Sequence, residues 1–136
     1  MITAVDSSIL LDVLTNDPRN CAGSLSALRG ARQTGRIIAC PVVWAEVRAH
    51  FENAGALWEA FSEAGLVFDP FDQKCADLAG ALWREYRRSG GSRAHLIPDF
   101  LIGAHAQVRC GVLLARDRGF FRRHFGSLRI VDPSSG

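Results

Sequence analysis

Four acidic residues each stand where a strand-to-helix turn or the first turns of a helix are expected. They are Asp6, Glu46, Asp99 and Asp117. In an open α/β sheet, functional groups gather outside the carboxyl ends of the strands. Carboxylates brought together there repel one another unless a positive ion lies between them, and Mg²⁺ and Mn²⁺ prefer carboxylate oxygen and water as ligands. The positions therefore predict a divalent metal site made of hard oxygen donors.

Each of these residues also has an ordinary structural explanation. A carboxylate at a helix N-terminus accepts hydrogen bonds from unpaired N–H groups and faces the positive end of the helix dipole, and Glu46 could be a solvated helix residue. The joint pattern favours a site, because Asp6 ends an almost wholly apolar run. Asp99 is followed one turn later by Gly103 and then by Ala106. We expect these small residues to leave room above the Asp99 carboxylate for an ion and a substrate backbone.

Other chemistries fit the sequence less well. A phosphoaspartyl phosphatase carries a second Asp two residues after its nucleophile, where this chain has Ser8. A response-regulator receiver carries an acidic pair at its first strand and a lysine near its end, whereas the sole lysine here is Lys74. The chain has no phosphate-cradling glycine loop, no H-E-x-x-H and no G-x-S-x-G. Hydrolysis by a metal-activated water needs no side-chain nucleophile, which agrees with this pattern.

Strand and helix patterns alternate along the whole chain. Short apolar runs predict strands at residues 2–6, 37–40, 66–68, 112–115 and 129–131. Apolar residues at helical spacing predict helices at 8–14, at 20–34, from 41 onward, around 57–61, and at 72–88, 98–110 and 117–124, with a Gly/Ser loop at 89–92. Such alternation is typical of a parallel sheet covered by helices on both faces.

Length and composition bound the class of protein. At 136 residues the chain is most simply one domain, residues 1–136, with its own core. No apolar segment approaches the roughly 20 residues that span a bilayer, and no signal-peptide pattern opens the chain, so we expect no membrane association. The four cysteines form no C-x-x-C pair. They predict free thiols in a reducing, cytoplasmic setting.

The basic residues are almost all arginine, which suits phosphate because its planar fork donates two parallel hydrogen bonds. A genome that favours arginine codons would give the same excess. Clusters at residues 84–88, 116–118 and 122–123 are more informative than the total, because two of them flank a proposed acidic position. From position alone, Arg116 and Arg118 are candidates to hold phosphates of a nucleic acid.

At these residues the sequence resembles PIN-domain ribonucleases, and among them the VapC-type toxins of bacterial toxin–antitoxin pairs. The resemblance covers essentially the whole chain and rests on four segments in order, residues 5–11, 41–47, 97–106 and 114–121. It implies a PIN-like three-layer α/β/α sandwich with a central, mainly parallel sheet of about five strands. It also implies Mg²⁺- or Mn²⁺-dependent cleavage of RNA.

The resemblance gives each candidate residue a role. The catalytic, metal-binding quartet of the family matches Asp6, Glu46, Asp99 and Asp117. Asp6 and Asp99 would be the principal ligands, Glu46 a ligand or water-orienting base, and Asp117 a ligand held directly or through water. One ion or two could bind. Ser7 matches a small hydroxyl residue beside the first Asp and is a candidate for substrate binding. The family often has Ser or Thr where this chain has Ala115, which puts the fine positioning of Asp117 in doubt.

The function implied is an endoribonuclease toxin that is neutralised by a cognate VapB-like antitoxin and associates as a homodimer. The aromatic-bearing stretch 42–61, with Trp44, Phe51, Trp58 and Phe61, would suit a partner groove or be ordinary core. Two alternatives remain: a housekeeping RNA-processing PIN nuclease, and a non-catalytic RNA-binding PIN-like module. An incomplete acidic set would favour the non-catalytic module, whereas the set here is complete.

Overall fold

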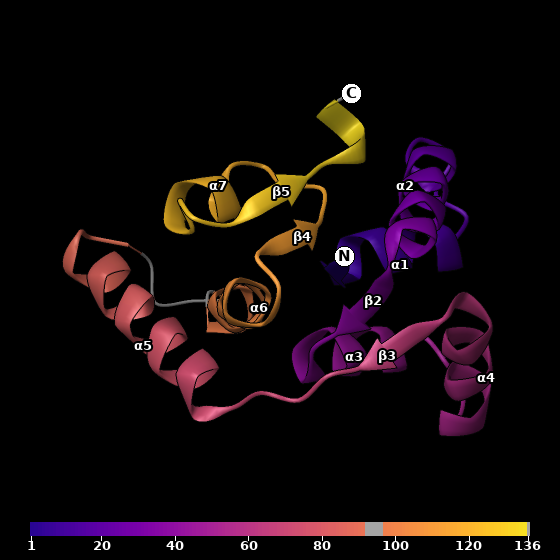
Figure 1. Cartoon of the computed structure of the whole chain (residues 1–136), viewed down its shortest axis with the longest axis horizontal. Helices are drawn as coiled ribbons and strands as arrows, with labels where there is room; N and C mark the ends of the chain where they lie inside the picture. Colours follow the sequence, from indigo (N-terminus) through magenta and orange to yellow (C-terminus); the bar gives the residue numbers. More distant parts are fainter. Residues whose placement is uncertain (92–96, 136) are drawn as a thin grey trace.

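Five parallel strands form a central sheet in the order β3-β2-β1-β4-β5 (Figure 1). The computed structural model describes residues 1–91 and 97–135. The strands are β1 (Ile2–Val5), β2 (Arg36–Ala39), β3 (Leu66–Phe68), β4 (Val112–Leu114) and β5 (Arg129–Val131). Because every pairing is parallel, the carboxyl ends of all five strands meet at one edge. The predicted parallel sheet of about five strands is confirmed.

Helices cover both faces of this sheet. They are α1 (Ser7–Leu14), α2 (Cys21–Thr34), α3 (Pro41–Arg48), α4 (Ala54–Ala64), α5 (Gln73–Arg88), α6 (Ile97–Arg109) and α7 (Phe120–His124), and a 3₁₀ turn follows at Pro133–Ser135. In Figure 1, α1, α2 and α4 lie on one side of the strands and α6 and α7 on the other. Helix α5 packs outside α6. The three-layer α/β/α architecture expected from the sequence is confirmed.

The two halves of the chain run in opposite directions across the sheet. From β1 the chain moves outward through β2 to β3, and it then crosses back to build β4 and β5 on the other side of β1. The reversal lies between β1 and β4. In open parallel sheets, ligands bind beyond the carboxyl ends of the strands at such a switch point.

The core lies between the sheet and the two helix layers. Val5, Ile37, Ile38, Leu113 and Leu114 are each at most 1% exposed. Strands buried on both faces read as continuous apolar runs rather than alternating ones, which is why β1, β2 and β4 could be located from sequence. Of the helices in the described part of the chain, none combines the length and apolar character that crossing a bilayer requires.

The predicted helix near the C-terminus is shorter in the structure than expected, and the predicted Gly/Ser loop is described only in part. The helix predicted at 117–124 begins only at Phe120, because Gly119 has a φ of 107° and interrupts the helical path. The Gly/Ser loop predicted at 89–92 is described as far as Gly91, while Ser92 lies outside the described residues.

Gly103 was expected to leave room above Asp99, and the structure gives it another role. A Cβ at Gly103 would lie 2.4 Å from the ring of Phe125, which is 1% exposed. The missing side chain therefore lets α6 approach the segment that follows α7. Ala106 is likewise buried in the core. The expectation was wrong because the close neighbour is an aromatic ring of the protein rather than a ligand.

Gly103→Ala should lower the free energy of unfolding by about 1–3 kcal/mol, since the added methyl overpacks the contact with Phe125. Gly30→Ala is the matched control, because Gly30 lies within α2 and a Cβ there would meet nothing within 4 Å. It should raise stability by roughly 0.5–1 kcal/mol, as alanine does in open helix positions. Urea denaturation followed by tryptophan fluorescence measures both. Shifts in the same direction would contradict the packing role.

Candidate functional site

Asp6 is held at the end of β1 by the start of α1. Its backbone N–H donates to the carbonyl of Leu114, at the end of the neighbouring β4. Its Oδ2 accepts from the hydroxyl of Ser8 at 2.6 Å and from the backbone N–H of Ser8 at 3.3 Å. The side chain thus caps α1, and the residue is 7% exposed. Asp6 therefore has a structural role, and its position is compatible with a functional one as well.

Glu46 lies on α3, which starts directly after β2. Pro41 occupies the first turn of this helix, where its fixed φ and missing N–H are favourable. Val43 and Val47 are fully buried and fix the face that α3 turns to the core. Ser7 donates its hydroxyl to Oε1 of Glu46 at 2.9 Å. Ser7, which we had considered for substrate binding, therefore joins α1 to α3 and orients the glutamate.

Asp99 stands in the first turn of α6. Its neighbour Phe100 is fully buried, and the Phe100 ring lies 5.0 Å from Phe120, 5.4 Å from His124 and 5.8 Å from Tyr86, centroid to centroid. These edge-to-face contacts anchor the helix start. The carboxylate of Asp99 accepts no hydrogen bond from any described residue that would stabilise its charge. Asp99 is thus anchored by its neighbour, and no donor within residues 1–91 and 97–135 offsets its charge.

The carboxylates of Asp6, Glu46 and Asp99 influence one another. Burial raises the pKa of all three above its usual range. The charges of Asp6 and Glu46 raise the pKa of Asp99 further, to about 6. The charge of Asp6 also raises the pKa of Glu46. Burial and these same two charges raise the pKa of the Cys40 thiol to about 11. The structure therefore brings together three of the four predicted acids in a field that favours a cation.

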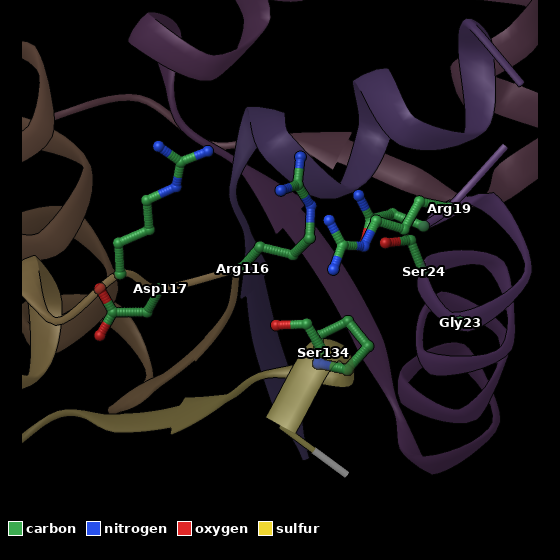
Figure 2. Close-up of a pocket in the computed structure, with 9 residues that line it drawn as sticks. Arg19, Gly23, Ser24, Arg116, Asp117 and Ser134 are labelled. Atoms are coloured by element: carbon green, nitrogen blue, oxygen red, sulfur yellow. The ribbon is translucent and has the colours of Figure 1, made fainter. Parts of the chain in front are cut away.

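Asp117 is engaged elsewhere. Its Oδ1 accepts from the backbone N–H groups of Gly119 and Phe121 at 3.0 and 3.1 Å, and its Oδ2 accepts from that of Arg122 at 3.0 Å. The side chain is 1% exposed. In Figure 2 its carboxylate points away from Arg19 and Ser24 across the neighbouring hollow. The structure thus shows Asp117 organising the start of α7, and its predicted part in metal binding stays a prediction.

Arg116 is also bound within the protein. Its Nε and one terminal nitrogen donate to the two carboxylate oxygens of Asp12 at 2.7 and 2.8 Å. Asp12 is 3% exposed and accepts a further hydrogen bond from the hydroxyl of Ser24 at 2.7 Å. This network ties α1, α2 and the loop after β4 together. Arg118 is exposed, so of the two arginines proposed for phosphate only Arg118 has its guanidinium available.

The donor chemistry of the site suits a hard divalent cation. Three carboxylates with raised pKa gather at one edge. Among the described residues, Arg116 is the one positive side chain that lowers any of these pKa values, and its effect on Asp6 is the smallest of the causes there. Within residues 1–91 and 97–135, however, no three Asp, Glu, His or Cys side chains converge closely enough to enclose an ion. Mg²⁺ usually keeps several water ligands and binds through one or two carboxylates, so these residues fit an ion held partly through water.

Comparison with protein-family models identifies the family of the chain. Residues 3–125 match the PIN domain. The chain belongs to the PIN domain family. None of the curated proteins matches it.

Solved structures with the same fold include toxin–antitoxin complexes. VapBC2 from Rickettsia felis, bound to a DNA fragment from its promoter, matches with a TM-score of 0.74 and 19% identity over 97% of this chain and 98% of that one. VapBC-1 from nontypeable Haemophilus influenzae gives 0.70 and 15% over 98% and 99%. FitAcB from Neisseria gonorrhoeae gives 0.69 and 19% over 98% and 99%. At these identities the likeness shows that this PIN domain shares their fold.

Three residues of the PIN domain's carboxyl edge were missed in the sequence. Ser8 accepts from the backbone N–H of Arg116 at 3.2 Å while it donates to Asp6. Asp12 holds Arg116, and Asp132 accepts from the backbone N–H of Asp117 at 3.0 Å. Only Asp12 could have been recognised from the sequence, because it is an acid within the apolar helix pattern at 8–14. Ser8 and Asp132 act across long sequence separations, which periodicity does not report.

Asp99→Asn should stabilise the metal-free PIN domain near neutral pH, whereas Asp117→Asn should destabilise it. Asp99 has a raised pKa in the folded state, so its ionised form opposes folding; this penalty is absent below about pH 4 and complete above pH 6. The amide removes it, for a gain on the order of 1 kcal/mol after allowing for solvent screening. Urea denaturation in EDTA at pH 4 and pH 7.5 should show the gain only at pH 7.5.

Asp117→Asn should destabilise the domain because it disrupts the hydrogen bond that Oδ2 of Asp117 accepts from the N–H of Arg122. The amide keeps one acceptor oxygen but places an NH₂ group against one of the backbone N–H donors. Unfolding should become easier by about 1–2 kcal/mol. If the two substitutions shift stability in the same direction at pH 7.5, the division into a charge-strained residue and a capping residue is wrong.

Proposed function

We propose that this PIN domain is a metal-dependent endoribonuclease of the VapC toxin type. The observation that carries the proposal is the group of three mutually repelling carboxylates at the carboxyl edge of the sheet, in a chain of the PIN family. The similarity in fold to toxin–antitoxin complexes supports the toxin role. We further propose that residues 1–136 act as one domain in the cytoplasm.

The site residues have distinct parts in this reaction. Asp6 and Asp99 are the proposed principal ligands of Mg²⁺ or Mn²⁺, and Glu46, oriented by Ser7, is a further ligand or the base that orients water. The bound ion would lower the pKa of water and so supply hydroxide at neutral pH. The hydroxyl of Ser8 keeps the Asp6 carboxylate in one orientation. Asp117 would contribute through water, with α7 as its direct partner.

One observation favours the non-catalytic alternative. In the described part of the chain, the acidic side chains are not gathered into one coordination sphere, and Asp117 is committed to backbone N–H groups. An RNA-binding PIN-like module would have the same fold and no need for an ion. Metal binding and cleavage separate the two readings, because the module would show neither.

The proposed partner is a VapB-like antitoxin, and the protein itself is proposed to form a homodimer. Of the aromatic residues expected to suit a partner groove, Phe61 is buried and Trp44 packs edge-on against Phe61 and Phe68. Trp58 remains 65% exposed, and Val67 and Phe68 on the edge strand β3 are 41% and 46% exposed. These three side chains provide apolar surface that an amphipathic antitoxin segment could cover.

Purified protein should cleave RNA with Mg²⁺ or Mn²⁺ and lose this activity in EDTA. Asp99→Asn should reduce cleavage by about a hundredfold or more, as losing one preorganised electrostatic contact does in other enzymes. Asp77→Asn, which removes the same charge from an exposed position of α5, should leave activity unchanged. Sequencing the 5′ ends of the fragments identifies the RNA and the cut. Cleavage of equal strength by the Asp99 variant would reject the proposed mechanism.

A thermal melt with Mn²⁺ tests the same site without catalysis. An ion that binds only the folded state at a hundredfold excess over Kd stabilises by about 2.7 kcal/mol, which raises the Tm by several degrees in a domain of this size. The shift should be smaller in Asp99→Asn and unaltered in Asp77→Asn. RNA binding without any Mn²⁺ shift or cleavage in the wild type would favour the non-catalytic module.

A further inference from the structure

A polar hollow of about 480 Å³ lies beside the acidic edge, on the side of α2 (Figure 2). Three segments that are far apart in the sequence form its wall: the start of α2, the loop after β4 and the turn after β5. Its polar lining includes the basic Arg19, Arg116 and Arg118, the acidic Asp117, and Ser24 and Ser134. We call it the arginine hollow. All its cationic lining groups are guanidinium groups, which bind phosphate oxygens in pairs of hydrogen bonds.

The arginines of the hollow differ in availability. Arg116 is paired with both oxygens of Asp12, so it forms a fixed wall. Arg19 and Arg118 are exposed, and no hydrogen bond or ion pair from a described residue engages either guanidinium. The backbone of Arg19 is nevertheless fixed, because Oδ1 of Asp17 accepts from its N–H at 2.9 Å. The N–H groups on either side of Arg118 are bonded as well, that of Asp117 to Asp132 and that of Gly119 to Asp117.

The carboxylates around the hollow are already satisfied by donors of the protein. Asp12 is bonded to Arg116 and Ser24, and the side chains of Asp117 and Asp132 are 1% and 3% exposed. Asp117 is held by the N–H groups of α7, and Asp132 accepts from the N–H and hydroxyl of Ser134. Asp17 accepts from backbone N–H groups. These hydrogen bonds occupy the carboxylate oxygens without cancelling their charges, so the cations that remain available to a ligand in the hollow are those of Arg19 and Arg118.

A short chain of contacts joins the hollow to the acidic site. The hydroxyl of Ser8 donates to Asp6 at 2.6 Å and accepts from the backbone N–H of Arg116 at 3.2 Å. One hydroxyl group therefore separates a proposed metal ligand from the wall of the arginine hollow. A nucleic-acid strand bound for cleavage at Asp6 and running toward α2 would bring its next phosphates to the hollow.

We propose that the arginine hollow binds a backbone phosphate of the RNA strand adjacent to the cleaved bond, through Arg19 and Arg118. This inference rests on the proposed nuclease function and names the substrate contact on the α2 side. Arg19 takes the place of Arg116 as a predicted phosphate ligand, because the guanidinium of Arg116 is bonded to Asp12. Arg116 instead fixes the wall against which the phosphate lies.

The test compares two double variants of equal net charge. Arg19→Gln with Arg118→Gln empties the hollow of free cations. The control, Arg36→Gln with Arg129→Gln, removes two exposed arginines where β2 and β5 begin, at the opposite edge of the sheet. All proteins also carry Asp99→Asn and are kept in EDTA, so that labelled single-stranded RNA stays intact. Fluorescence anisotropy gives Kd at several salt concentrations.

The hollow variant should bind RNA about tenfold or more weakly at 0.1 M salt, and its salt slope should fall by about 0.7, the value for one lost phosphate contact on a single strand. The control should change both quantities far less, and both variants should keep the melting temperature of the parent. Equal losses in the two variants, or no loss in the hollow variant, would overturn the inference.

Two further measurements are needed. The first distinguishes an RNA phosphate from a free phosphate ion, and the second separates failure of the nuclease proposal from failure of the phosphate site. If calorimetry shows that the hollow variant loses binding of inorganic phosphate while RNA binding is unchanged, the hollow holds a free anion and the RNA assignment is wrong. If the protein without Asp99→Asn cuts no RNA with Mn²⁺ but the hollow variant still loses RNA affinity, the nuclease proposal fails and the phosphate site stands. A parent that binds no RNA would overturn the inference.

Discussion

The repulsion among Asp6, Glu46 and Asp99 is the constraint on which the rest of the carboxyl edge depends. Carboxylates that crowd one another and have raised pKa values oppose folding at neutral pH, so neighbouring elements must hold them in place. Ser8 fixes Asp6, Ser7 fixes Glu46, and the aromatic contacts of Phe100 fix the start of α6. The surrounding core supplies the stability that this crowding removes, and a cation at the edge would relieve it.

The parallel sheet was predictable because it follows from patterns that are local in the sequence, whereas the strand order and its switch point come from the structure. Fully buried strands appear as short apolar runs, and their alternation with helices leaves few topologies. The placement of Asp6, Glu46 and Asp99 beyond strand ends or at a helix start then followed from strand position alone. The positions of these three residues could therefore be predicted without knowing their side-chain partners.

The remaining features depend on contacts that local patterns do not contain. Asp117 also follows a strand, yet the positive φ of Gly119 turns backbone N–H groups toward its carboxylate. The partner of Arg116 lies 104 residues earlier in the chain. The small size of Gly103 serves an aromatic ring on another element. For Arg116 and Gly103 the deciding neighbour comes from a distant segment, whereas for Asp117 it is the local backbone conformation at Gly119, which apolar periodicity does not report.

The bond between Asp12 and Arg116 has a consequence for how such a protein can diversify. Arg116 is bound to a buried acid whose loss of a partner would leave a charge stranded in the core, typically a penalty of several kcal/mol, so this arginine is closed to change. Arg19 and Arg118 stand in the same wall with no such obligation. If the wall holds an RNA phosphate as proposed, substitutions at Arg19 or Arg118 would change target preference while the architecture behind the wall stays constant.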